Sequence, residues 1–158
     1  LPFTYPRYEH GISTYDHAYA DEVDPMYGTN GFNPEWEFGH GLSYSEFTYS
    51  NLSLGRDSVF KDDTLIVLVE LENKGSRTGK EVVQVYISDE VASLVPSVKR
   101  LRDFKKIELD KNQSKLLTFH IDVHDLGFVH PGEASKSVES GWFTLSVGDL
   151  SARFFVKH

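Results

Sequence analysis

The sequence predicts an all-β fold: a two-sheet antiparallel sandwich of about seven strands, preceded by an irregular aromatic arm. Three observations support this prediction. Apolar residues alternate with polar ones along several short stretches, turn-forming residues separate the stretches, and no stretch has the spacing of a convincing amphipathic helix. The chain has 158 residues, which is enough for about one domain with a substantial buried core.

Seven stretches of residues 44–158 have the composition of short strands. They are, in order, Tyr44–Leu54, Thr64–Glu72, Glu81–Ser88, Leu101–Leu109, Lys115–Val123, Trp142–Gly148 and Leu150–Lys157. Turn signals stand between them, with Asn73-Lys74-Gly75 and Asp110-Lys111-Asn112 as two examples and Gly148-Asp149 as a hairpin signal before the last strand. The number and spacing of these stretches are typical of an immunoglobulin-type sandwich.

The alternation also predicts which side chains are buried. In most stretches every second residue is apolar, so one face of the strand turns to the core. In Glu81–Ser88 both faces are largely apolar, which favours a central position in its sheet. Trp142 stands at the start of its stretch, where we expect it to be buried. The row predicted to be inward in Lys115–Val123 comprises Leu117, Phe119, Ile121 and Val123.

The chain contains no cysteine. Disulfide scaffolds, thiol nucleophiles and cysteine-ligated metal sites are therefore excluded. The Cys…Trp…Cys pattern of immunoglobulin domains is also missing, which favours a fibronectin type III-like variant of the sandwich.

The first 43 residues differ from the rest. They carry seven acidic residues and one basic residue, whereas residues 44–158 carry 17 and 15. Seven of the eight tyrosines lie at or before position 49, and four of the six prolines lie in the first 43 residues. Prolines interrupt helices and sheet ladders, and aromatic rings bury large areas once they meet a surface. We therefore expect residues 1–43 to lie over this domain or over a neighbouring one.

The net charge and the length of the apolar runs exclude several classes of function. The net charge is −8, and nucleic-acid binding needs a concentrated basic face, so we expect no nucleic-acid partner. No apolar run is long enough for a transmembrane helix, so we expect no membrane partner. The chain opens with Leu1-Pro2-Phe3 and shows no leader pattern, from which we expect that a leader was removed or that the chain is the end of a longer one.

Candidate chemical sites are weak. On a strand, His120, Asp122 and His124 would share one face and could suit zinc, but a solvated outer face explains them better. The acidic run Asp21–Asp24 lacks the frame of a calcium loop, and the basic run from Lys99 to Lys106 is interpreted as an exposed sheet edge. We predict no catalytic residue, no metal site and no cofactor.

Several segments, in order, resemble the C-terminal part of family 3 glycoside hydrolases, the family of β-glucosidases and β-xylosidases. The segments that carry the resemblance are Leu1–Arg7, Phe38–Phe47, Asn73–Gly75, Gly79–Asp89, Leu101–Ile107, Asp125-Leu126 and Gly141–Gly148. Two departures are minor: Ser45 stands where the family usually has Thr, and Ser140 stands before Gly141 where the family has Pro. The acidic stretch at 16–31 is not part of the pattern, and its role stays open.

The resemblance implies that residues 1–43 are the tail of the preceding catalytic α/β domain plus a linker arm, and that residues 44–158 are a fibronectin type III-like domain. The family cleaves terminal β-D-glucosyl and related residues with retention. Its nucleophile and its acid/base residue lie in domains that precede this region, so we expect the 158 residues alone to be inactive. The expected location, also from the resemblance, is the periplasm or the cell exterior.

The implied function is non-catalytic. The domain would pack on the catalytic domains of the same polypeptide and stabilise them. The predicted docking or linker residues are Phe38, Gly39, Gly41, Leu42, Tyr44 and Phe47. The two glycines would allow tight approach or a positive φ, and the four apolar residues would anchor the arm or, alternatively, belong to the domain's own core. The alternatives are a carbohydrate- or surface-binding module that uses Trp36 and the arm tyrosines, and a protein–protein adhesion module.

Overall fold

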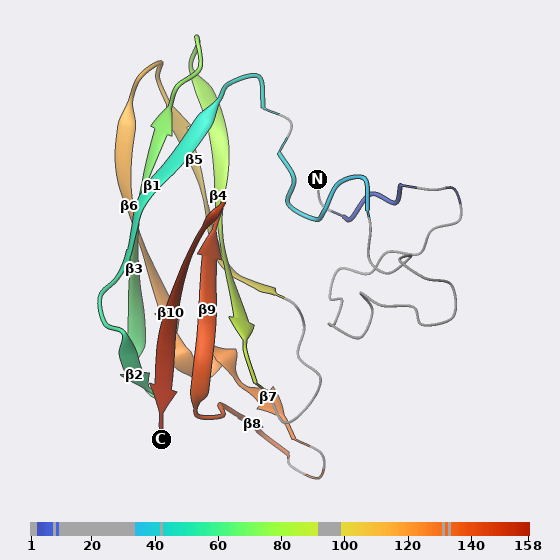
Figure 1. Ribbon diagram of the computed structural model, residues 1–158, viewed down its shortest axis with the longest axis vertical. Helices are drawn as coiled ribbons and strands as arrows, with labels where there is room; N and C mark the ends of the chain where they lie inside the picture. The colour runs from blue at the N-terminus through green and yellow to red at the C-terminus, as the bar shows by residue number, and fades with distance from the viewer. Residues whose placement is uncertain are drawn as a thin grey trace.

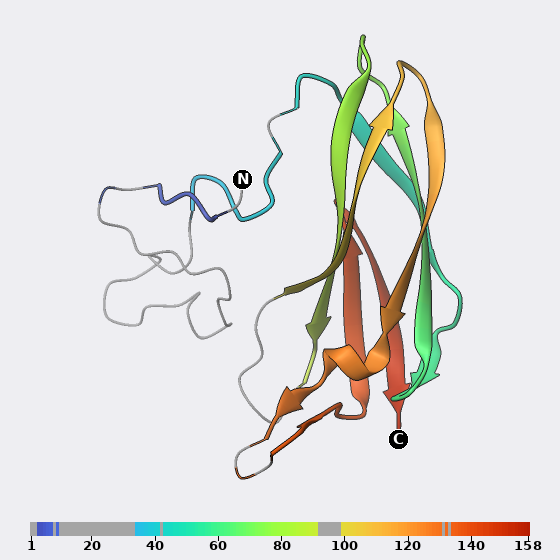
Figure 2. The ribbon, with the colours of Figure 1, turned by 180° about the vertical axis from the view of Figure 1, so that it is seen from behind.

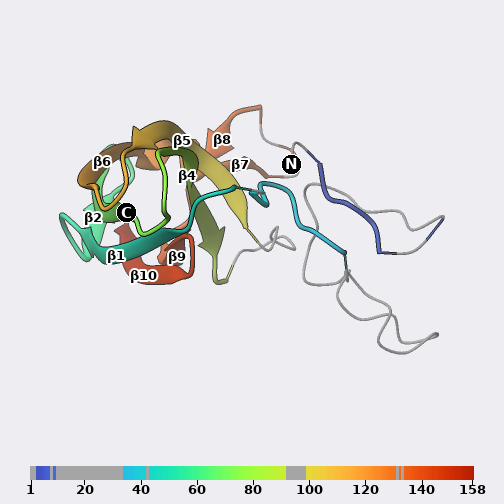
Figure 3. The same ribbon diagram turned by 90° about the horizontal axis from the view of Figure 1, so that it is seen from above.

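The computed structural model describes residues 3–7, 9, 34–41, 43–91, 99–130, 132 and 134–158. From residue 47 onward the described chain forms two packed β-sheets, and the described parts of the arm lie to one side of them (Figures 1 and 2). Viewed along the long axis, the strands surround a common centre, and the described part of the arm extends away to one side of them (Figure 3). This confirms the all-β sandwich that the alternation predicts.

The smaller sheet has three antiparallel strands in the order β1-β3-β6. They are β1 (Phe47–Leu54), β3 (Thr64–Asn73) and β6 (Ser114–Asp122). A register shift between Ser50 and Ser53 interrupts the pairing of β1 with β3, and Asn51 in this bulge has a φ of 54°.

The larger sheet has five strands in the order β2-β10-β9-β4-β5. They are β2 (Ser58–Phe60), β4 (Gly79–Asp89), β5 (Arg100–Leu109), β9 (Gly141–Val147) and β10 (Leu150–Lys157). β2 pairs with β10 in parallel, and the other neighbours are antiparallel. The central place predicted for Glu81–Ser88 is confirmed, because β4 lies between β9 and β5.

The connection from β6 to β9 holds the remaining elements. A short 3₁₀ turn, η2 (Val123–Leu126), follows β6, and then β7 (Phe128–Val129) pairs with β8 (Lys136–Ser137). Among the described residues η2 is the only helical element, in agreement with the predicted lack of amphipathic helices.

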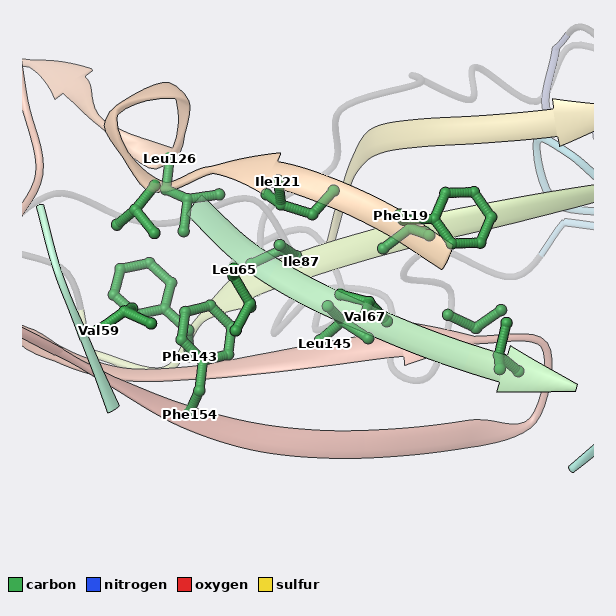
Figure 4. Close-up of a cluster of buried hydrophobic side chains, with 14 of the residues drawn as sticks. Val59, Leu65, Val67, Ile87, Phe119, Ile121, Leu126, Phe143, Leu145 and Phe154 are labelled. Atoms are coloured by element: carbon green, nitrogen blue, oxygen red, sulfur yellow. The ribbon is translucent and has the colours of Figure 1, made fainter. Parts of the chain in front are cut away.

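The core lies between the two sheets, where the inward rows of their strands meet (Figure 4). Phe143 and Phe154 stack with ring centroids 5.5 Å apart, and Leu65 and Phe119 contribute from the opposite sheet. The predicted inward rows are confirmed, since Leu117, Phe119, Ile121 and Val123 are all at most 4% exposed. Burial of these rows is the main force that holds the sheets together.

Some boundaries and one burial prediction were wrong. The strand predicted to reach Val123 ends at Asp122, because the Asp122 carboxylate accepts a hydrogen bond from the His124 N–H and starts η2. Val123 nevertheless stays buried. No alternating pattern predicts β2, β7 and β8, because they are only two or three residues long. Trp142 is 45% exposed, because its neighbour Phe143 takes the inward position on β9.

Candidate functional site

The arm reaches the sandwich at Gly39. The Gln84 side-chain amide on β4 donates to the Gly39 carbonyl over 3.0 Å, and the Tyr86 hydroxyl donates to Gln84 Oε1 over 2.6 Å. Gly39 has a φ of +82°, and a Cβ at this position would lie 2.7 Å from the Tyr86 hydroxyl oxygen and closer still to the Gln84 amide. Glycine is therefore required here both by the backbone conformation and by the close approach.

An ion pair fixes the arm next to this contact. Lys99 Nζ lies 2.7 Å from Glu37 Oε2 and 5.4 Å from the centroid of the Tyr86 ring. Both charged side chains are partly exposed, so the pair contributes modestly, on the order of 0.2–1 kcal/mol. Together with the Gln84 contact, it holds residues 37–39 against the outer face of the five-stranded sheet.

The end of the arm is held by the turn between β3 and β4. The Ser45 hydroxyl donates to the Arg77 carbonyl over 2.9 Å, and the Lys74 N–H donates to the Glu46 carbonyl over 2.8 Å. A Cβ on Gly75 would lie 2.6 Å from the Ser45 hydroxyl oxygen, so this glycine makes room for the arm. The turn therefore holds the residues that lead into β1 in place through hydrogen bonds.

Asn73 holds this turn from inside. Its side chain is fully buried, and its amide donates to the carbonyls of Arg77 and Leu109 over 2.9 and 3.0 Å. Its side-chain oxygen accepts from the Gly75 N–H over 3.0 Å. These three hydrogen bonds fix the conformation of the turn, because breaking any of them would leave a buried polar group without a partner.

The residues predicted for docking differ in burial and in their contact with the sandwich. Phe38 and Phe47 are half-buried, and Phe47 packs against the core of the sandwich. Tyr44 is 95% exposed, and a Cβ on Gly41 would meet nothing within 4 Å. Leu42 lies outside the described residues. The docking role of this set stays a prediction. Within it, the sandwich holds Gly39 and Phe47 but not Tyr44.

No sequence pattern singles out Gln84 and Tyr86, the side chains that hold the arm against β4. Gln84 and Tyr86 stand on β4 with the same parity and opposite to the buried valines, so strict alternation already places both on the outer face. That signal shows exposure only. The partner of Gln84 is 45 positions away in the sequence, and no local pattern reveals it.

The arm also carries an aromatic cluster. Tyr5 and Trp36 form an isolated antiparallel bridge, in which the Tyr5 N–H donates to the Trp36 carbonyl over 2.8 Å. The Tyr5 ring lies 5.4 Å from the Trp36 ring and 6.1 Å from the Phe3 ring. Phe3 and Tyr5 remain about half exposed, at 52% and 45%. Two passages of the arm thus form a partly exposed aromatic surface.

Between the arm and the sheet lies a hollow of about 640 Å³. Arm residues 34–40 form one wall. Side chains from β1, β4 and β9 form most of the rest, together with Lys99 and Gly148. The Tyr49 hydroxyl donates to Glu81 Oε1 over 2.8 Å in this hollow. Burial raises the pKa of the Tyr49 phenol well above its usual value, and the neighbouring Glu81 carboxylate adds to the shift.

The candidate metal sites from the sequence do not form a group of ligands among the described residues. The part of the chain that the structure describes holds no group of three His, Cys, Asp or Glu side chains suited to a metal ion. His120 and Asp122 end β6, while His124 belongs to η2 and no longer continues the strand. Asp21–Asp24 lies outside the described residues.

The basic run belongs to an edge strand, as predicted. β5 is the last strand of its sheet, and its charged side chains divide between the two faces. Lys105 turns toward the other sheet, where its ammonium group donates to the Thr118 carbonyl and lies 4.9 Å from the Phe119 ring centroid. This lysine closes the open side of the sandwich and protects the edge. Among the described residues no helix is long and apolar enough to span a membrane.

Comparison with known proteins gives the same fold. The family of fibronectin type III-like domains matches residues 81–151. The chain is 33% identical to a periplasmic β-glucosidase of Salmonella typhimurium, with 97% of this chain and 21% of that protein covered. It is 39% identical to a β-xylosidase of Formosa agariphila, with 75% and 16% covered.

A solved structure extends the likeness to the arm. The β-glucosidase of Listeria innocua in complex with glucose superposes with a TM-score of 0.80 at 28% identity, over 92% of this chain and 22% of that one. The chain belongs to the fibronectin type III-like domains of family 3 glycoside hydrolases. It spans about a fifth of the length of the relatives it matches.

Proposed function

We propose that this chain is a non-catalytic accessory part of a β-glucosidase-like glycoside hydrolase, which packs on the catalytic domains of the same polypeptide and stabilises them. In this proposal residues 44–158 are the accessory domain, and residues 1–43 are the tail of the preceding catalytic domain and its linker. The parent enzyme would hydrolyse terminal β-D-glucosyl or related residues and would act in the periplasm or outside the cell.

The observation that supports this proposal is the clamped arm. Gly39 is held by Gln84 on β4 and Glu37 by Lys99 just before β5, while the rings of Phe3 and Tyr5 on the same arm stay about half exposed. A flexible tether would need neither feature. Exposed aromatic clusters next to polar surface are typical of protein interfaces, and the matched relatives are about five times longer than this chain.

The first test is enzymatic. The 158-residue chain and its full-length parent are assayed with p-nitrophenyl β-glucoside and p-nitrophenyl β-xyloside. We expect the parent to release nitrophenol and the chain alone to release none. Turnover by the pure chain would overturn the non-catalytic role, because it would require a catalytic carboxylate pair within these residues.

The second test concerns docking. In the full-length parent, Tyr5→Ala should lower the melting temperature and shorten the half-life of activity, because the interface would lose the contacts that the Tyr5 ring makes. Trp142→Ala is the matched control, since Trp142 is equally exposed at 45% but lies on β9 away from the arm. Equal effects of the two substitutions would refute a docking surface at the arm.

A further inference from the structure

We propose that the hollow between the arm and the five-stranded sheet is a binding site for a neutral pyranoside. The hollow is lined by Trp36 from the arm, by Glu81, Gln84 and Tyr86 from β4, and by Ser146 from β9. Its volume of about 640 Å³ lies within the range of small-molecule sites. Trp36 belongs both to the hollow and to the aromatic cluster of the arm, but the polar lining comes from β4 and β9, so the site goes beyond the accessory role.

The charges around the hollow select against ionic ligands. Glu35 pairs with Arg7 at 3.2 Å, and Glu37 pairs with Lys99 at 2.7 Å. The Glu81 carboxylate takes part in neither of these two ion pairs, and its negative charge can accept hydrogen bonds from a ligand. An anionic ligand would be repelled by this carboxylate. A metal ion would need more ligands, and no suitable group of three exists in the described part of the chain. A neutral ligand rich in hydroxyl groups fits both conditions.

The lining also matches the two kinds of surface that a sugar offers. Hydroxyl groups of a pyranose can donate to the Glu81 carboxylate and exchange hydrogen bonds with Ser146, and bonds to an ionised acceptor are the stronger kind. The apolar C–H face of the ring requires an aromatic or aliphatic surface, which Trp36 and the exposed Val82 supply.

The polar groups of the hollow are held in place before any ligand arrives. The Tyr49 hydroxyl fixes the Glu81 carboxylate, and the Gln84 amide is fixed between Gly39 and Tyr86. Fixed side chains reduce the entropy cost of binding. For a ligand as small as one sugar ring, the expected Kd is on the order of millimolar. Since the relatives include β-glucosidases and a β-xylosidase, methyl β-D-glucoside and methyl β-D-xyloside are the probes.

The chain offers a built-in reporter, because Trp36 and Trp142 are its only two tryptophans. Trp142→Phe leaves Trp36 in the hollow as the sole reporter, and Trp36→Phe leaves Trp142 on the distant part of the sheet. Titration with methyl β-D-glucoside should give a saturable fluorescence change in Trp142→Phe and none in Trp36→Phe. No saturable change in Trp142→Phe up to ten times the expected Kd, or equal changes in both variants, would overturn the site.

A second variant tests the role of the carboxylate. Glu81→Gln keeps the shape and an oxygen that can accept from Tyr49, so it should preserve the fold and weaken binding about tenfold, measured by titration calorimetry. Glu108→Gln on β5 is the control, because Glu108 is exposed and forms a surface ion pair with Lys80 at 2.9 Å. Thermal melts confirm that both variants are folded. Unchanged affinity in Glu81→Gln would overturn the proposal, while the nitrophenyl assays of the parent test the accessory role independently.

Discussion

Replacement of Gly39 by alanine should release the arm from the sheet. The left-handed backbone at φ +82° costs an L-residue about 1–2 kcal/mol, and the new methyl group would lie 2.7 Å from the Tyr86 hydroxyl oxygen. Loss of the hydrogen bond from Gln84 adds about 1 kcal/mol. The sum of about 2–3 kcal/mol should raise the population of the detached arm roughly 30- to 150-fold.

Nuclear magnetic resonance can measure this release directly. In Gly39→Ala the Gln84 side-chain amide signals should move toward solvent-exposed values, and the His40 N–H, which donates to the Glu37 carbonyl over 3.1 Å, should exchange faster. Signals from β6 should not move, because that strand lies in the other sheet.

The matched control is Gly41→Ala. Gly41 has no positive φ, and a Cβ there would meet nothing within 4 Å, so this variant should behave like the wild type. If Gly39→Ala also leaves the Gln84 and His40 signals unchanged, the close approach of the arm to β4 does not exist in solution, and the clamp on which the proposed function rests would have to be abandoned.

Three further predictions concern the stability of the domain. Asn73→Ala should lower the free energy of unfolding in urea by about 2–4 kcal/mol, because it leaves buried carbonyl and N–H groups without partners. Thr78→Ala in the same turn removes one exposed hydrogen bond and should lower the free energy of unfolding by less than about 1 kcal/mol. Equal losses in the two variants would contradict the argument from burial. The raised pKa of Tyr49 means that the unfolded chain ionises first, so its contribution to stability is complete below about pH 10 and is lost above it. Tyr49→Phe should therefore lose stability less steeply than the wild type in alkaline urea titrations, and parallel profiles would refute this. Gly148→Ala, at φ +59° and with a Cβ position 2.8 Å from the Tyr49 ring, should cost about 2 kcal/mol in the same assay, and a loss below about 0.5 kcal/mol would show that the turn relaxes around the methyl group.

The sandwich was predictable because its signals are local. Alternation along Thr64–Glu72 and Glu81–Ser88 identified both the strands and their buried rows. It failed where elements are too short to show a period, as in β2, and where a side chain ended a strand, as Asp122 does. Trp142 shows a different error. Its place at the start of a strand suggested burial, but the alternation of that strand, with Phe143 inward, already placed it outside.

The sequence by itself determined the seven longer strands and their apolar faces, because these properties depend on residues only a few positions apart. The tertiary structure alone decided that β2 joins β10 in parallel and that the arm lies against β4. It also created the hollow lined by Trp36 and Glu81. These contacts join residues 45 positions apart or more. They form only because burial of the core first brings the strands together and fixes the surface on which the arm can rest.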